Sequence, residues 1–177
     1  MACNNQYLSN IGRDCSPAKG GIRQAWFAVW ADDIFTVSAD TNNNPYEVSA
    51  INSATTWYHY EFRKGTGSFT STQSIDEANG LNYVETDVVL RFGRMETNKR
   101  YGVAALALGG VAGIVEDNNG SFWAFGVDEE MVPQAGTGQS GTAVGDGNWY
   151  EITLRDTYQS FPLMITASAM ENLNVAE

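Results

Sequence analysis

The chain has 177 residues, of which 43% are hydrophobic, and it carries a formal net charge of −11 with a pI near 4.4. Five Trp, eight Tyr and eight Phe exclude a disordered chain, and the length suits a single domain with a sizeable core. The acidity argues against sequence-specific recognition of DNA or RNA, because such a chain repels phosphates, although solubility alone would explain the same charge.

Membrane and redox signals are weak. Residues 1–10 lack the basic and apolar regions of a signal peptide, and the most apolar stretch, residues 103–115, is too short and too rich in Gly to span a bilayer. Cys3 and Cys15 are either a disulfide pair or, as we favour, free thiols of a reducing cytoplasm. We expect neither a metal nor a cofactor, since a single His leaves these thiols without partners for a zinc site.

Turn-rich composition predicts an N-terminal arm over residues 1–21, followed by one β-rich domain over residues 22–177. Residues 22–30 are apolar on both faces, which predicts a central strand that is covered twice. Residues 34–38 and 46–51 are predicted to form a short strand pair.

Three polar strands are predicted next, over residues 57–63, 67–75 and 83–92. In the third strand Glu85 and Asp87 lie opposite an apolar face, so we expect them to be solvated. The second strand is polar on both faces, so its sequence does not decide which face points inward. One of its faces consists only of hydroxyl residues, namely Ser68, Thr70, Thr72 and Ser74.

The C-terminal half predicts one helix and further strands. Residues 94–108 form the helix candidate, and residues 111–126 read as a hairpin. Residues 133–147 contain five Gly and are predicted to be a flexible loop. Alternation predicts a strand over residues 148–155, and a further short strand is expected over residues 163–166.

Catalytic signatures are not found. His59 lies between two Tyr on a predicted strand, with no nucleophile or carboxylate arranged around it, and is interpreted as structural. Residues 136–141 lack the Gly-Lys-Ser/Thr ending of a phosphate loop. Residues 117–120 resemble the start of a calcium loop, but Asp128 stands where a bidentate Glu is needed, so a hairpin turn is expected. The chain is therefore predicted not to be an enzyme.

The order of elements resembles a family. The polar strands, the helix over residues 94–108, the segment VAGIVEDNNGSFWAFG (residues 111–126) and the strand NWYEITL (residues 148–154) are together similar to a bacteriophage tail tube protein. The segment DCSPAKGGI (residues 14–22) resembles N-terminal segments of tube-like structural proteins in Bacteroidetes phages. The resemblance covers most of residues 14–155.

The resemblance implies a mainly β protein, a β-sandwich or barrel with one flanking α-helix, that assembles into rings. The rings are expected to be hexameric and to stack on themselves and on other tail proteins of the virion, after assembly in the host cytoplasm. Double-stranded DNA would pass through without specific binding during ejection. A head–tail connector ring is left open. The expected lumen-facing residues are Ser68, Thr70, Thr72, Ser74, Glu85 and Asp87.

Two alternatives remain. Surface Trp and Tyr residues would suit a carbohydrate-binding β-sandwich module, which would be a monomer. An acidic hydrolase would use two of the carboxylates of Glu61, Glu85 and Asp87, provided that they face one pocket.

Overall fold

The computed structural model describes residues 10–39 and 45–176. The protein is mainly β, with a five-stranded and a four-stranded antiparallel sheet, a strand pair and one helix longer than a single turn. The five-stranded sheet has the order β11-β8-β7-β1-β4, formed by β1 (Ile22–Val29), β4 (Tyr58–Tyr60), β7 (Val111–Asp117), β8 (Phe122–Phe125) and β11 (Leu163–Met164). The four-stranded sheet has the order β5-β6-β10-β9, formed by β5 (Gly67–Asp76), β6 (Leu81–Gly93), β9 (Val132–Gln139) and β10 (Trp149–Tyr158).

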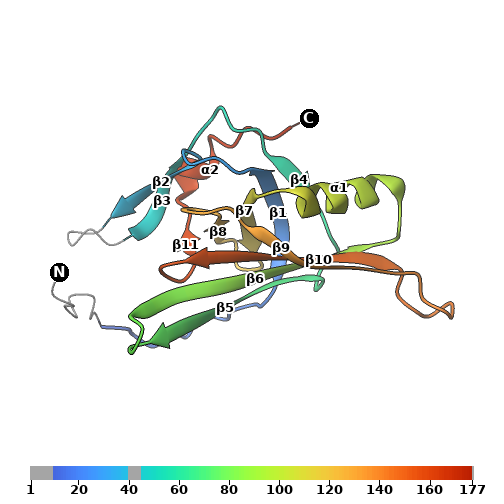
Figure 1. Cartoon of the computed structure of the whole chain (residues 1–177), viewed down its shortest axis with the longest axis horizontal. Helices are drawn as coiled ribbons and strands as arrows, with labels where there is room; N and C mark the ends of the chain where they lie inside the picture. Colours follow the sequence, from blue (N-terminus) through green and yellow to red (C-terminus); the bar gives the residue numbers. More distant parts are fainter. Residues whose placement is uncertain (1–9, 40–44, 177) are drawn as a thin grey trace.

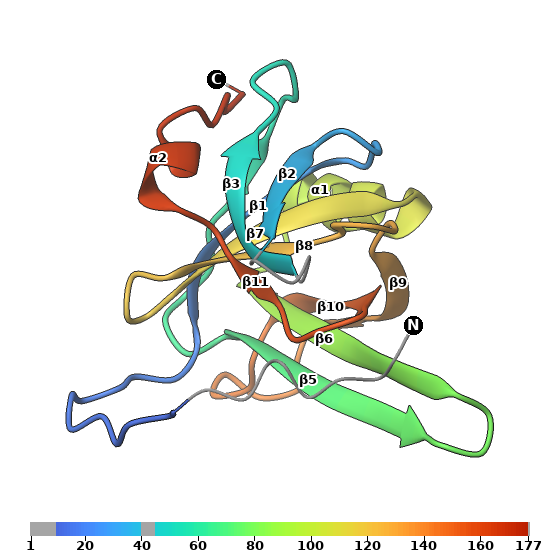
Figure 2. The ribbon, with the colours of Figure 1, turned by 90° about the vertical axis from the view of Figure 1, so that its left-hand side faces the viewer.

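The elements form three layers. Figures 1 and 2 show β5 and β6 at the bottom, the five-stranded sheet in the middle, and the pair β2 (Phe35–Ala39) and β3 (Pro45–Ile51) with the short helix α2 (Ala167–Met170) above it. One apolar cluster fills the space between the two large sheets, and a second fills the space between the five-stranded sheet and the top layer. This confirms the predicted β-sandwich with a flanking helix.

Strand β1 is buried on both faces, as its apolar sequence predicts. Ala25 and Phe27 belong to the cluster between the large sheets, whereas Trp26 and Ala28 belong to the cluster under the top layer. Successive side chains of a strand point to opposite faces, so a strand with two apolar faces needs cover on both sides.

The four-stranded sheet, by contrast, has only one covered face. The predicted inward residues of β6 are buried, as are Ile152 and Leu154 of β10, and all of them except Val84 belong to the cluster between the two large sheets. The intervening residues of both strands are only partly buried. The inward residues of β6 are Val84, Val88, Leu90 and Phe92.

Two predicted elements differ clearly in extent from the structure. The strand expected over residues 57–63 shrinks to β4, Tyr58–Tyr60. The loop expected over residues 133–147 is wrong in its first half, because β9 pairs with β10 as an edge strand. Its residues are exposed throughout, so no alternation of apolar residues marks it as a strand. The loop proper covers residues 140–148.

The helix α1 (Thr97–Leu108) starts three residues later than predicted, since Arg94 has a φ of 65° and does not continue a helix. Leu106 anchors α1 to the cluster between the sheets. Among residues 10–39 and 45–176, no helix has the length and hydropathy that crossing a bilayer requires.

Asp156 links the two large sheets. It lies on the inward face of β10, is 4% exposed, and its Oδ1 accepts a hydrogen bond of 2.8 Å from the backbone N–H of Gly126, which follows β8. Burial, together with the nearby charges of Asp128 and Glu129, raises the pKa of Asp156 to about 6. The folded protein therefore holds a proton on this carboxyl that the unfolded chain loses near its ordinary pKa of 3.8.

We predict that Asp156→Asn stabilises the protein at alkaline pH. Because the folded-state pKa is raised, the stability contributed by Asp156 is present below its unfolded pKa and is lost as the pH rises through about 6. Asn keeps an oxygen for Gly126 and never ionises. In urea denaturation, the variant should exceed the wild type in free energy of unfolding by up to about 3 kcal/mol near pH 8, and this gain should shrink below pH 4. A gain that is the same at both pH values would contradict the assignment.

Candidate functional site

The outward side of the four-stranded sheet is mostly polar, with Val89 and Trp149 as its large apolar residues. We call the polar residues of this side that are named below the polar face. The register of β5 against β6 places Thr70 opposite Asp87 and Thr72 opposite Glu85, and residues that lie directly opposite one another share a face. The polar face comprises Ser68, Thr70, Thr72 and Ser74 of β5, Glu85, Asp87 and Arg91 of β6, and Glu151, Thr153 and Arg155 of β10.

All six residues expected to line a lumen thus lie on one surface. The orientation of β5, left open by its sequence, follows from its other side. Phe69 packs on Trp123 and Phe125, and the hydroxyl of Ser71 shares a 2.8 Å hydrogen bond with that of the buried Thr86. The face with Phe69 is therefore the inward one, and the face of hydroxyls points away from the core.

Glu85 and Asp87, which were expected to be solvated charges, are partly exposed, at 36% for each side chain, but both are paired with an arginine. Arg155 of β10 donates two hydrogen bonds to Asp87, of 2.7 and 2.9 Å, and its Nη1 lies 3.6 Å from Glu85 Oε1. The Arg155 side chain is one-third exposed, and the guanidinium holds the pKa of Asp87 below its usual value. Two Lys side chains in place of these carboxylates would face Arg155, so that substitution would not be neutral for folding.

The second arginine of the polar face is paired in the same manner. Arg91 Nη2 lies 2.7 Å from Glu151 Oε2, and the Arg91 guanidinium lies over the Trp149 ring at 4.2 Å. Three carboxylates and two arginines leave the polar face with one net negative charge, and both of its cations are engaged within the chain. Sequence reasoning missed Arg155 because its partners lie 68 positions away in the chain.

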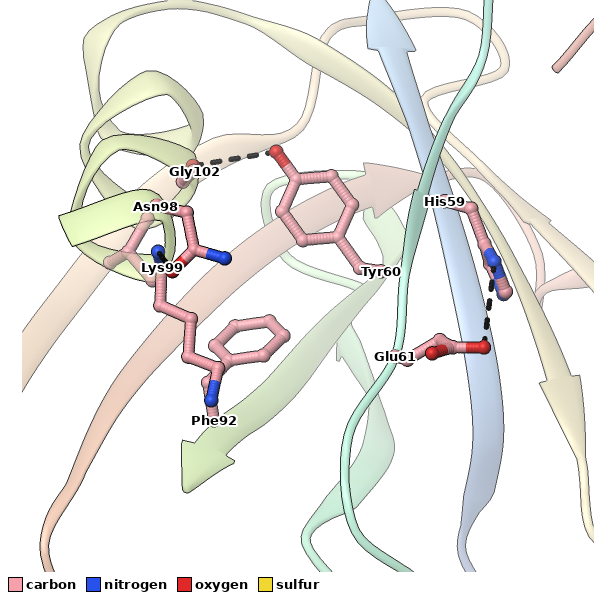
Figure 3. A pocket seen from close by; sticks show the side chains of 8 residues that line it. His59, Tyr60, Glu61, Phe92, Asn98, Lys99 and Gly102 are labelled. Carbon is pink, nitrogen blue, oxygen red and sulfur yellow. Dashed lines mark hydrogen bonds and ion pairs between the residues drawn. The ribbon is translucent and has the colours of Figure 1, made fainter. Parts of the chain in front are cut away.

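A separate pocket of about 440 Å³ lies between β4 and the start of α1 (Figure 3). His59, Glu61 and Lys99 line it, but their polar atoms are largely engaged in structural contacts. His59 stacks on Trp26 and its Nε2 lies 3.0 Å from the side-chain oxygen of Gln24, while Lys99 donates to the Gly93 carbonyl. The nearest carboxylate, that of Glu61, is 4.0 Å from His59 Nδ1 and is mostly exposed. The pocket has no activated nucleophile.

The other candidate groups are not brought together. Glu61 lines the pocket beside β4, whereas Glu85 and Asp87 lie together on the polar face, where both contact Arg155. Glu61 therefore does not join the other two carboxylates of the hydrolase alternative. Residues 117–120 form the turn between β7 and β8, with Asp117 accepting from the N–H groups of Asn119 and Ser121. Within the described part of the chain, no group of three or more His, Cys, Asp or Glu is placed to hold a metal. Cys15 is an exposed free thiol, and Cys3 lies outside the described residues.

Comparison of the chain with protein-family models, with curated proteins and with solved structures finds no match.

We predict that Arg155→Gln weakens the protein mainly at neutral pH. The lowered pKa of Asp87 means that this pair stabilises the fold above the unfolded pKa and loses its effect as the pH falls through the folded one. Because the side chains are about a third exposed, the loss at pH 7 should stay below about 1 kcal/mol. Urea denaturation of Arg155→Gln, Asp87→Asn and the double variant, at neutral pH and near pH 2.5, measures the coupling. A coupling that persists unchanged in acid would argue against the ion pair.

Proposed function

We propose that this protein is a structural virion protein whose copies close into rings, six to a ring, that stack into the tail tube or head–tail conduit of a phage. Double-stranded DNA would pass through the lumen without specific binding. The observation that carries the proposal is the four-stranded sheet, which combines a polar face with two long open edges.

The two large sheets differ in the length of their edge strands. The five-stranded sheet ends in β11 and β4, which have two and three residues. The four-stranded sheet ends in β5 and β9, of ten and eight residues, and within the described residues each pairs with one neighbour only. Monomeric proteins usually keep exposed edge strands short, because unpaired N–H and C=O groups attract other chains. Two long open edges are expected where a second copy is to continue the sheet.

The strand directions favour such continuation. The three pairings within the sheet are all antiparallel, so β5 and β9 run in opposite directions. If β9 of one copy lies beside β5 of the next, the antiparallel alternation continues from copy to copy. The contact is head-to-tail, and such contacts form rings when the rotation closes.

Ring closure would leave the polar face on one side of a continuous barrel and the core on the other. Barrels of 16–18 strands already enclose an aqueous channel, and six copies of a four-stranded sheet would enclose a wider one. The five-stranded sheet, the top layer and α1 would lie outside this wall.

The chemistry of the polar face suits a conduit. Each free Lys or Arg on the wall would add a phosphate contact and hold DNA in a salt-dependent way. The hydroxyls of β5 carry no charge, and Arg91 and Arg155 are already bound to carboxylates. A duplex would therefore meet a hydrated surface with few groups free to bind it.

The carbohydrate-binding alternative has less support. All five Trp are buried or half-buried, so none offers the exposed indole face that a sugar ring would need. Tyr46, Tyr58 and Tyr101 are exposed, so stacking on a sugar would depend on Tyr alone. A Trp fluorescence that responds to glycans, in a protein that stays monomeric, would favour that alternative.

We predict that the protein forms closed rings in solution. Sedimentation velocity and native mass spectrometry at increasing concentration should detect a closed species of six chains, together with its stacks. A chain that remains monomeric at every concentration, and in particles viewed by negative-stain microscopy, would refute the proposal.

We predict that positive charge added to the polar face makes the rings bind DNA. Ser68 is exposed and Ser74 is half-buried, and they lie opposite Val89 and Tyr83 and not opposite a carboxylate, so the double variant Ser68→Lys/Ser74→Lys should fold and form rings like the wild type. Its rings should retain linear duplex DNA at low salt and release it as salt rises, because each Lys adds phosphate contacts around the lumen. Wild-type rings should retain little.

The matched control is Thr36→Lys/Ser49→Lys, which adds the same charge to exposed positions of β2 and β3 in the outer layer. These rings should behave like the wild type in electrophoretic retardation. Equal retention by both double variants, or none by either, would contradict the assignment of the polar face to the lumen.

A further inference from the structure

Three arginines meet at one end of the four-stranded sheet. Arg63, Arg91 and Arg94 line a pocket of about 400 Å³ together with Trp149, and we call this the arginine pocket. The whole chain has only ten Lys and Arg against 21 Asp and Glu, and three of the ten line this pocket, while Lys19, Arg23 and Lys64 line another. Asp146 also lines the pocket, but its carboxylate accepts two backbone N–H groups of the neighbouring loop.

Arg63 is the arginine of this pocket that is free to bind a partner. Arg91 is paired with Glu151, and Arg94 is paired with Glu96 at 3.0 Å. The guanidinium of Arg63 is exposed and makes no ion pair within residues 10–39 and 45–176. The pocket thus presents one unpaired cation beside the ring of Trp149, which suits a carboxylate that carries apolar neighbours.

The opposite end of the same sheet has the matching chemistry. The turn between β5 and β6, which we call the hairpin tip (residues 75–81), carries the exposed carboxylate of Glu77. Asp76 does not compete, because its oxygens accept from Ala78 and Asn79 within the turn. Ile75 and Leu81 flank Glu77 and are 66% and 50% exposed, although both are apolar.

The two features lie far apart in one molecule. Figure 1 shows the hairpin tip at one end of the long axis and the loop between β9 and β10, which borders the arginine pocket, at the other. The 13 residues of β6 alone span about 40 Å. The tip therefore cannot reach the pocket of its own chain, whereas a second copy placed end to end could bring them together.

We infer that the hairpin tip of one copy docks in the arginine pocket of a copy in the next ring, with Glu77 bound to Arg63 and the apolar flanks of the tip against Trp149. This inference rests on the proposed ring assembly. Both features belong to the sheet that would form the barrel, so they stand at the same radius on opposite rims. Copies that each carry a net charge of −11 repel one another, and a local opposite-charge contact fixes both the register and the polarity of the stack.

A charge exchange tests the contact. Glu77→Arg gives a positive tip against a positive pocket, and Arg63→Glu gives a negative tip against a negative pocket. Each variant should form rings whose mutual association is weakened about tenfold or more, the equivalent of about 1.4 kcal/mol. Preformed rings of the two variants, when mixed, should stack again in alternation, because each tip then meets a pocket of opposite charge. Sedimentation velocity and negative-stain microscopy measure the length of the stacks.

Matched controls separate this contact from net charge. Lys64→Glu makes the same change of charge at the residue next to Arg63, and Lys64 does not line the arginine pocket. Glu171→Lys changes an exposed carboxylate outside the four-stranded sheet. Both should stack like the wild type. If the two test variants stack normally, or if their mixed rings do not stack again, the docking contact is overturned. The proposed function still stands in that case, provided that the rings themselves form. A protein that forms no rings would overturn both.

Discussion

The burial of β1 on both faces determines the arrangement of the other layers. Because Phe27 and Trp26 point to opposite sides, the five-stranded sheet must be covered twice, and it becomes the middle of three layers. The top layer of β2, β3 and α2 is small, yet it completes the second cover. The four-stranded sheet supplies the first cover with one face only. Its other face is thereby released from packing, and polar residues can accumulate there without loss of core.

Much of this arrangement could be predicted from the sequence, where the signal is local. The twofold alternation of β6 and β10 follows from residues such as Val88 and Leu154, which are buried because their neighbours are not. Strand β9 escaped prediction because it buries none of its residues and contains Gly136 and Gly138, so it carries neither alternation nor strand propensity. Its conformation depends on backbone pairing with β10, a non-local cause that a pattern of side chains does not record.

The candidate site shows the same division. The row of hydroxyls in β5 is a local pattern, and its shared face with Glu85 and Asp87 follows once the register is known. The pairing with Arg155 depends on how β10 aligns with β6, and the chain between these strands includes α1, β7, β8 and β9. The carboxylates of β6, which have no partner within their own strand, are therefore neutralised by an arginine of β10. The arginine pocket likewise gathers residues from three separate segments of the chain.

In the proposed assembly, an open edge must not attract every other strand before a ring closes. Strand β9 carries Pro133, which lacks an N–H, and its glycines offer no apolar side chains to a foreign sheet. Strand β5 presents hydroxyls on its outward face, and its large inward side chain Phe69 is already packed on Phe125. Either edge alone is thus a poor partner for unspecific pairing. The proposed association would then depend on the whole surface fitting at once, which would favour closed rings over irregular aggregates.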